Sequence, residues 1–387
     1  MNAQVHARQQ AQLAFAASNQ PLVVGDVAAC PLPPAELAAL TTDSPLVVEH
    51  FGGGLTARVL HLCIDGEHYT LKQRRAEALV RNIDGETSFL NEVQRRADFT
   101  RLKADPAWAG RFDHIVPTLY ADYRLGIILS PWLPGQPLNR FDANIFRQIL
   151  TTAVACEEAG LMEWDLCPGN ILEDQGTIWL FDFGYMYPFD PLTQFNSNGL
   201  SDPLFHACER FETRNFFGWL LRHSQAMDTA AQLALYRELK EVALEVYQQK
   251  LAWLQSQNAS PAVLAWVLSF INRWQQALQD PDALQSLFEV ENFRSQVLDI
   301  EDARTRHARG LRVKVTQSEQ ADQFLQGLAD ILMPHRAGIC PVHVCYRRTG
   351  VQGQLTLGTE WRVTPTDQLL DELRSRVGKQ GVELIFE

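Results

Sequence analysis

Two short stretches decide how this sequence is interpreted: DLCPGN at residues 165–170 and DFG at residues 182–184. An apolar pair follows Asn170, and the apolar run 178–181 leads into Asp182. Phosphoryl transfer requires Mg²⁺ ions that bridge the phosphates of a nucleotide, and Mg²⁺ prefers oxygen ligands. A carboxylate and an amide oxygen on two adjacent loops can hold such an ion, and a further carboxylate must lie near the attacking hydroxyl.

This combination resembles the catalytic core of the protein-kinase-like superfamily, which includes eukaryotic-type kinases and small-molecule phosphotransferases such as aminoglycoside kinases. The resemblance implies that Asp165 orients or deprotonates the hydroxyl acceptor and that Asn170 and Asp182 ligate Mg²⁺. Its motifs lie within about residues 45–225, and the implied core extends to about residue 290. ATP and Mg²⁺ are the implied cofactors.

The resemblance extends upstream to a phosphate-binding loop and a strand lysine. The glycines at the position of the loop are Gly52, Gly53 and Gly54. Lys72 matches the lysine that contacts the α- and β-phosphates, which makes it the second catalytic candidate. Glu92 is expected to pair with Lys72, and Glu86 is the competing partner.

Further downstream, residues 123–129 are expected to form a buried strand. The stretch 128–135, which contains Ser130 and Trp132, resembles the hinge where adenine would bind. Glu163-Trp164 stands where the family has a histidine followed by Arg or Gly, and no Ala-Pro-Glu segment follows the DFG. The missing segment favours a small-molecule or atypical acceptor over that of an ordinary Ser/Thr protein kinase.

An enzyme is the primary hypothesis, because Lys72, Asp165, Asn170 and Asp182 are all present. Each residue taken alone is typical of an ordinary strand or loop. The alternative is a catalytically inactive pseudokinase that serves as an adaptor.

The fold class expected is α+β, with a bilobal kinase-like fold and a small α+β domain after it. The expected segments are an N-terminal arm (1–44), a β-rich lobe (45–133), a helical lobe (134–293) and a C-terminal domain (294–387).

Local signals in the β-rich lobe predict a hairpin and a helix. Strands at 57–64 and 68–72 flank Asp65-Gly66, a dipeptide typical of tight hairpins. A helix is expected at 89–102, with Ser88 as its N-cap.

The C-terminal segment shows its own alternation of strands and helices. They are expected at 311–315, 321–332, 341–347, 354–357, 361–363, 367–377 and 382–386.

This segment resembles the extreme C-terminus of the alpha subunit of bacterial DNA polymerase III. The resemblance rests on SQVLDIEDAR (295–304), HARGL (307–311), PVHV (341–344), WRVTPTDQLL (361–370) and GVELIFE (381–387). It implies a binding module for the tau subunit of the clamp loader, and a relic domain without a partner is the alternative. The polymerase body of that subunit is absent from this sequence, so no polymerase activity is expected. A fusion of two unrelated halves is a third possibility.

Composition excludes several other classes. The 387 residues include 34 Lys and Arg and 46 Asp and Glu, giving a formal net charge of −12, so direct nucleic-acid binding is not expected. No apolar run is long enough to span a membrane. The seven cysteines form no CxxC pair, which favours reduced thiols in a cytoplasmic protein.

Overall fold

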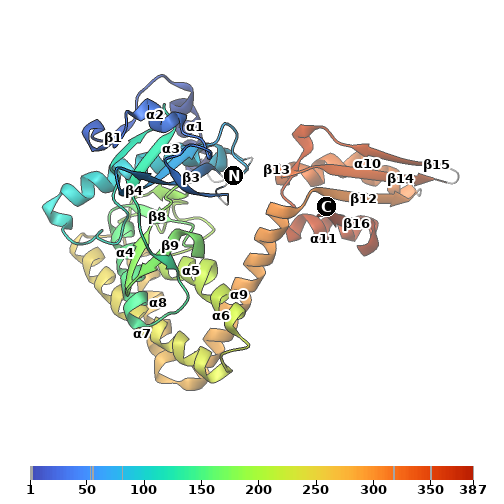
Figure 1. Cartoon of the computed structure of the whole chain (residues 1–387). Coiled ribbons are helices and arrows are strands. Elements are labelled where there is room, and N and C mark those ends of the chain that lie inside the picture. Colours follow the sequence, from blue (N-terminus) through green and yellow to red (C-terminus); the bar gives the residue numbers. More distant parts are fainter. Residues whose placement is uncertain are drawn as a thin grey trace. The chain divides into compact units, whose positions relative to one another are not determined.

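The computed structural model describes residues 3–52, 54, 56–80, 82–316, 319–348 and 351–386 (Figure 1). Helices and strands are mixed, as expected for the α+β class. The chain forms two compact units, Met1–Ser295 (unit 1) and Gln296–Glu387 (unit 2). None of the helices within those residues is long and apolar enough to cross a membrane.

The first part of unit 1 is a six-stranded antiparallel sheet in the order β1-β5-β6-β4-β3-β2. Its strands are β1 (Val23–Gly25), β2 (Val47–Phe51), β3 (Ala57–Ile64), β4 (Glu67–Arg74), β5 (Tyr120–Asp122) and β6 (Ile127–Pro131). The predicted hairpin is present. Asp65 and Gly66 both have positive φ, 52° and 84°, which is the conformation that a two-residue type I′ turn requires.

Helices and short 3₁₀ turns belong to the same part of unit 1 as this sheet. They are α1 (Ala3–Ala17), α2 (Pro34–Ala39), α3 (Ile83–Ala104) and the 3₁₀ turns η1 (Val27–Ala29) and η2 (Pro106–Trp108). Residues 1–44 were expected to form an N-terminal arm. In the structure β1 pairs with β5 and α1 packs on α3. The N-terminal segment is therefore part of the sheet's own architecture.

Helix α3 begins six residues earlier than predicted. Its N-cap is Asn82, whose side chain accepts a hydrogen bond from the Gly85 N–H (2.7 Å), whereas the Ser88 hydroxyl donates to the Gly85 carbonyl within the helix. The buried strand expected at 123–129 is present with later bounds, as β6 (Ile127–Pro131). Strand β5 ends at Asp122, and the chain turns at Gly126 with φ of 71° before β6 begins.

The second part of unit 1 is mainly helical. Its helices are α4 (Ala143–Glu158), α5 (Ala207–Phe211), the π-helical η4 (Glu212–Phe216), α6 (Phe217–His223), α7 (Thr229–Ser256), α8 (Pro261–Gln279) and the first part of α9 (Pro281–His307), with a 3₁₀ turn η3 (Pro168–Asn170). The unit boundary, after Ser295, falls within α9. Its short strands are β7 (Gln136–Pro137), β8 (Leu161–Glu163), β9 (Ile171–Asp174), β10 (Thr177–Leu180) and β11 (Met186–Pro188). Together α4, α7 and α8 enclose a large apolar core.

Unit 2 has its own core and a four-stranded sheet in the order β15-β14-β12-β16. Its elements are β12 (Gly310–Thr316), α10 (Glu319–Leu332), η5 (Met333–His335), β13 (Arg336–Cys340), β14 (Val342–Arg348), β15 (Val351–Thr356), η6 (Thr359–Trp361), α11 (Asp367–Val377), η7 (Lys379–Gly381) and β16 (Val382–Ile385). In this sheet β12 and β14 pair in parallel, and the other neighbours pair antiparallel. The strand expected at 361–363 is wrong, because Thr359–Trp361 forms a 3₁₀ turn and Val363 makes isolated β-bridges.

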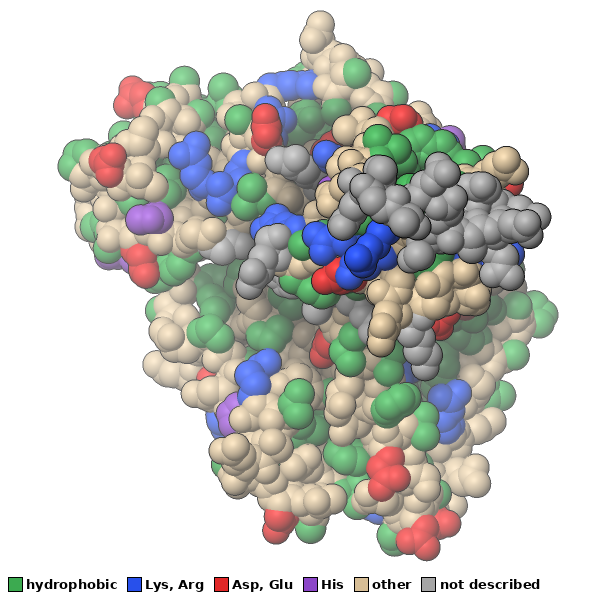
Figure 2. Space-filling view, turned by 90° about the vertical axis from the view of Figure 1, so that its right-hand side faces the viewer, with side chains coloured by type: hydrophobic (Ala, Val, Ile, Leu, Met, Phe, Trp, Pro, Cys, Tyr) green, Lys and Arg blue, Asp and Glu red, His purple; other side chains and the backbone are tan. Residues whose placement is uncertain are grey.

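The surface carries both signs of charge. On the face drawn in Figure 2, Lys and Arg side chains are interspersed with Asp and Glu side chains and with uncharged residues. All seven cysteines are free thiols.

Candidate functional site

Lys72 on β4 is held between two carboxylates. Its Nζ lies 3.0 Å from both Glu92 carboxylate oxygens and 3.1 Å from Asp182 Oδ2. Lys72 and Glu92 are only 6% and 3% exposed, so water screens this contact weakly. Glu92, rather than Glu86, is the α3 carboxylate that Lys72 contacts.

Arg96 supplies a second cation that the sequence analysis missed. It lies one turn beyond Glu92 on α3, and its Nη2 is 3.0 Å from Glu92 Oε1. Its Nη1 donates to the Ser130 hydroxyl at 3.3 Å. Ser130, expected to belong to a hinge, thus contacts α3 through its side chain. The i,i+4 spacing of Glu92 and Arg96 was the sequence signal that could have revealed this pair.

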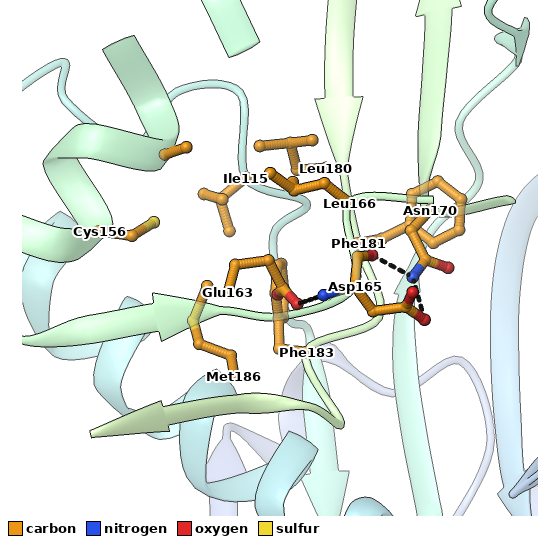
Figure 3. Close-up of a pocket in the computed structure, with 11 residues that line it drawn as sticks. Ile115, Cys156, Glu163, Asp165, Leu166, Asn170, Leu180, Phe181, Phe183 and Met186 are labelled. Atoms are coloured by element: carbon orange, nitrogen blue, oxygen red, sulfur yellow. Dashed lines mark hydrogen bonds between the residues drawn. The ribbon is translucent and has the colours of Figure 1, made fainter. Parts of the chain in front are cut away.

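Asp165 and Asn170 face each other across the loop that joins β8 to β9 (Figure 3). The Asn170 side-chain amide donates to the Asp165 carbonyl at 2.9 Å and approaches Asp165 Oδ2 at 3.4 Å. Arg214 contacts the other carboxylate oxygen, Oδ1, through Nη2 at 2.8 Å. Arg214 lies on the π-helical turn η4, 49 residues further along the chain, so no local pattern pointed to it.

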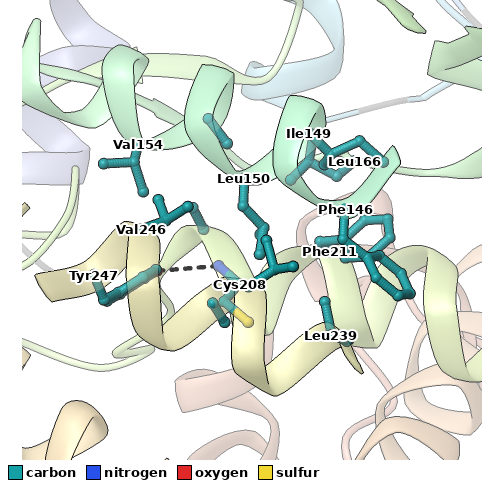
Figure 4. Packing of buried hydrophobic residues seen from close by; sticks show 14 of the residues in the cluster. Phe146, Ile149, Leu150, Val154, Leu166, Cys208, Phe211, Leu239, Val246 and Tyr247 are labelled. Carbon is teal, nitrogen blue, oxygen red and sulfur yellow. Dashed lines mark hydrogen bonds between the residues drawn. The ribbon is translucent and has the colours of Figure 1, made fainter. Parts of the chain in front are cut away.

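The apolar core anchors this loop. Leu166, next to Asp165, is 3% exposed and packs in the same buried cluster as Phe146 and Ile149 of α4 (Figure 4). The Asn215 side chain donates to the Leu166 carbonyl at 3.2 Å. The position of Asp165 is therefore fixed by packing and by hydrogen bonds from η4.

Glu163 occupies the place where the resemblance implied a histidine. Its Oε1 accepts the backbone N–H of Asp165 at 2.7 Å, so it supports the loop from inside (Figure 3). Burial raises the pKa of the Glu163 carboxyl to about 8. The hydrogen bond from the Asp165 N–H lowers this pKa, whereas the negative charges of Asp165 and Asp182 raise it. Glu163 is therefore mostly a neutral acid at pH 7.

Asp182 adopts a backbone conformation that few residues tolerate. Its φ is 68°, in the left-handed region, where Asp is one of the better accommodated residues. Desolvation by the surrounding protein would raise the pKa of Asp182, but the Lys72 ammonium, with Arg96 further away, outweighs it and holds the pKa below the ordinary value. Asp182 is therefore a carboxylate at neutral pH. Strained conformations of this kind cluster at functional sites.

Asn91 on α3 braces the segment after Asp182. Its amide donates to the carbonyls of Phe183 at 3.3 Å, Gly184 at 3.0 Å and Met186 at 2.7 Å. The same helix thus carries Glu92, which holds Lys72, and Asn91, which holds the DFG segment.

The expected glycine loop joins β2 to β3. Gly53 lies outside the described residues. A Cβ on Gly54 would meet the Ala57 carbonyl oxygen, whereas Gly52 has open space around it. Of these two described glycines, Gly54 is therefore the one that its surroundings require.

Trp132 follows β6 and packs against the sheet. Its backbone N–H donates to the His68 carbonyl at 3.1 Å, and its ring stacks on His61 with 3.6 Å between centroids. Trp132 is thus held by residues of β3 and β4.

The side-chain oxygen atoms of Asn170 and Asp182 are hard donors of the kind that Mg²⁺ prefers, and their role as a ligand pair stays a prediction. Among the residues that the structure describes, no group of three His, Cys, Asp or Glu side chains could hold a metal ion. A metal held here would thus rely on the two protein ligands together with oxygens of its phosphate ligand.

Comparisons with known proteins match the C-terminal region. Residues 327–378 match the family model for the DNA polymerase III subunit alpha, C-terminal domain. The DNA polymerase III subunit alpha of Vibrio cholerae is 50% identical over 91 residues, 24% of this chain and 8% of the relative. The protein of the same name from Escherichia coli K12 is 44% identical over 92 residues, with the same shares. That of Pseudomonas aeruginosa is 34% identical over 90 residues, 23% of this chain and 8% of the relative.

The chain thus spans about 8% of the length of the curated relatives it matches. The matched family segment lies within unit 2. The kinase-like interpretation of unit 1 rests on the residues and contacts described above.

Proposed function

We propose that unit 1 is an ATP- and Mg²⁺-dependent phosphotransferase with a bilobal kinase-like fold, which transfers the γ-phosphoryl group to a hydroxyl acceptor. The observation that carries the proposal is the position of Lys72 between Glu92 and Asp182, at 3.0 and 3.1 Å. A lysine held in this way is oriented to contact phosphate oxygens, because its long side chain has lost its rotational freedom.

The other side chains of the proposed site would have separate roles. Asn170 and Asp182 would hold Mg²⁺, which would neutralise charge on the phosphates. Asp165 would orient the acceptor hydroxyl or accept its proton. Arg214, 2.8 Å from Asp165, orients that carboxylate and keeps a positive charge beside it.

Thermal unfolding of the whole chain with ATP, with and without Mg²⁺, tests the nucleotide site. Ligand at about 100 times Kd stabilises the native state by about 2.7 kcal/mol. We expect a Mg²⁺-dependent shift that Asp182→Ala abolishes and that Asp113→Ala, at an exposed aspartate, retains. The absence of any shift in folded wild-type protein would favour the inactive alternative.

Catalysis is tested separately from binding. Asp165→Ala should lower Mg²⁺-dependent ATP turnover, with water or a hydroxyl compound as acceptor, by about 10²–10⁴-fold. Nucleotide-dependent stabilisation should persist in this variant. Unchanged turnover in folded Asp165→Ala protein would remove Asp165 from the mechanism.

For unit 2 we propose a replisome-type binding module that docks to the tau subunit of the clamp loader. The supporting observation is the match of residues 327–378 to the C-terminal domain of the polymerase III alpha subunit. A pull-down with tau should retain the full chain and lose a chain that ends at residue 295. Equal retention of both chains would refute docking through unit 2. If tau binds but ATP does not, the adaptor alternative is favoured.

A further inference from the structure

A cavity of about 620 Å³ opens between α1, α3 and the segment that follows β11, all within unit 1. Its polar lining includes Arg8 and Gln12 of α1 and Arg95 and Asp98 of α3. Phe15 is among its apolar residues. None of these five side chains belongs to the proposed nucleotide site.

Polar atoms without partners occur in side chains that line this cavity and in residues next to them in the sequence. Within the part of the chain that the structure describes, five such buried nitrogen and oxygen atoms belong to Arg8, Gln9, Gln12 and Tyr187, of which Arg8 and Gln12 line the cavity. Buried polar groups are normally paired, and an unpaired one costs about 1–3 kcal/mol. Such a concentration is expected where protein atoms are arranged for a ligand.

Arg8 carries two of these unpaired atoms. Its guanidinium stacks on the Tyr187 ring, 3.6 Å from the ring centre, and its Nη2 contacts Asp84 Oδ1 at 3.3 Å. Its Nε and Nη1 remain without partners. Gln12 is 8% exposed, and its amide nitrogen donates to Asn91 and Gln94 while its oxygen is unpaired.

The charged groups of the lining indicate the class of ligand. The lining contains two arginines, Arg8 and Arg95, and one carboxylate, Asp98, which is paired with Arg95 Nε at 2.9 Å. The Arg8 guanidinium keeps two donor nitrogens, which match acceptor oxygens of a carboxylate or phosphate. Phe15 and its apolar neighbours suit a hydrocarbon or aromatic body.

We propose that this cavity binds a small organic anion, a carboxylate or phosphate monoester with an apolar body. The ligand's oxygens accept hydrogen bonds from Arg8, and its body packs on Phe15. The site adjoins the brace of the DFG segment, because Arg95 Nη1 donates to Asn91 Oδ1 at 3.1 Å and to the Met186 carbonyl at 3.2 Å.

Titration calorimetry on the full chain tests the proposal with phenyl phosphate and benzoate as probes. Benzyl alcohol and benzylamine are the neutral and cationic controls. We expect both anions to bind and neither control to do so. Arg8→Gln should weaken anion binding by about tenfold or more, because hydrogen bonds to charged groups are lost.

A variant that fills the cavity provides an independent test. Ala11 lines the cavity on the exposed side of α1, so Ala11→Trp should fill the cavity without disturbing the core. Gln10→Trp, at an exposed α1 position outside the lining, is the matched control and should bind the anions normally. Circular dichroism verifies that each variant is folded.

Three results would overturn the site. The first is failure of both anions to bind the wild-type chain. The second is undiminished binding to Ala11→Trp. The third is binding that Asp182→Ala abolishes and Ala11→Trp retains, which would place the anions in the nucleotide site. Binding lost in Ala11→Trp and retained in Asp182→Ala supports the cavity whether or not unit 1 binds ATP.

Discussion

Replacing Glu163 with glutamine should change how the stability of unit 1 depends on pH. Glu163 is buried beside Asp165 and Asp182, and its pKa is raised from 4.5 to about 8. The folded state therefore binds a proton that the unfolded state has released between these pH values. Stability from this group is complete below pH 4.5 and is lost as the pH rises through the folded pKa.

The size of the effect follows from the width of that window. Each pH unit within the window is worth about 1.4 kcal/mol, so the wild type should lose about 3 kcal/mol from this group between about pH 5 and about pH 7.5. Glutamine has nearly the same shape, keeps an oxygen for the Asp165 N–H and carries no titrating proton. Glu163→Gln should therefore gain about 3 kcal/mol relative to wild type over the same interval.

Urea unfolding of both proteins across this pH range measures the difference directly, and other titrating groups cancel in the comparison. Glu67→Gln, at an exposed position on β4, is the control and should follow the wild type at every pH. Parallel wild-type and Glu163→Gln stabilities across the whole interval would refute the buried neutral acid.

Three other substitutions test separate parts of the structure. Arg214→Gln should lower ATP turnover by about tenfold or more and leave Mg²⁺-dependent nucleotide stabilisation intact, because Arg214 orients the Asp165 carboxylate; loss of both would assign Arg214 to nucleotide binding. Lys240→Met should destabilise unit 1 by about 3–5 kcal/mol in urea titrations, since it leaves Glu212 and Glu291 buried without their cation; a change below about 1 kcal/mol would contradict this. Leu369→Ala should lower the unfolding free energy of unit 2 by about 2–5 kcal/mol and shift one of two calorimetric transitions, because the two units have separate cores; equal shifts of both transitions would show coupled unfolding.

Local chemistry made several elements predictable. The Asp65-Gly66 turn fixes the β3–β4 hairpin because both residues tolerate positive φ. Helix α11 begins and ends where the sequence predicted, at Asp367 and Val377, because Thr366 caps it and Gly378 ends it. Lys72 was predicted to pair with Glu92, and its ammonium lies 3.0 Å from the Glu92 carboxylate. The contact of Lys72 with Asp182 was not predicted.

Tertiary contacts decided the features that sequence patterns did not predict. The first turns of α3 contain Gly85, Thr87 and Ser88, which are weak helix formers, so the apolar pattern suggested a start at Phe89. The Asn82 N-cap and the burial of Gly85, Thr87 and Ser88 set the earlier start. Glycine is required at 85 because a Cβ there would collide with the Val80 carbonyl oxygen.

Long-range partners were equally inaccessible to sequence patterns. Arg214 reaches Asp165 only after η4 folds against the loop, and Gln12 reaches Asn91 only after α1 packs on α3. These pairs are separated by 49 and 79 residues. A short motif carries no information at such separations.

Burial of charge does not by itself distinguish a functional cluster from a structural one. Lys240 is fully buried between two carboxylates, Lys72 is nearly so, and in both places desolvation offsets much of the Coulomb attraction. The rings of Tyr236 and Trp274, each 5.0 Å from the Lys240 ammonium, belong to the buried core. Around Lys72, by contrast, the Asp182 side chain is 41% exposed. Of these two clusters, the one around Lys72 can exchange solvent for a phosphate or a metal ion, so the proposed chemistry depends on Asp182 more than on the buried pair behind it.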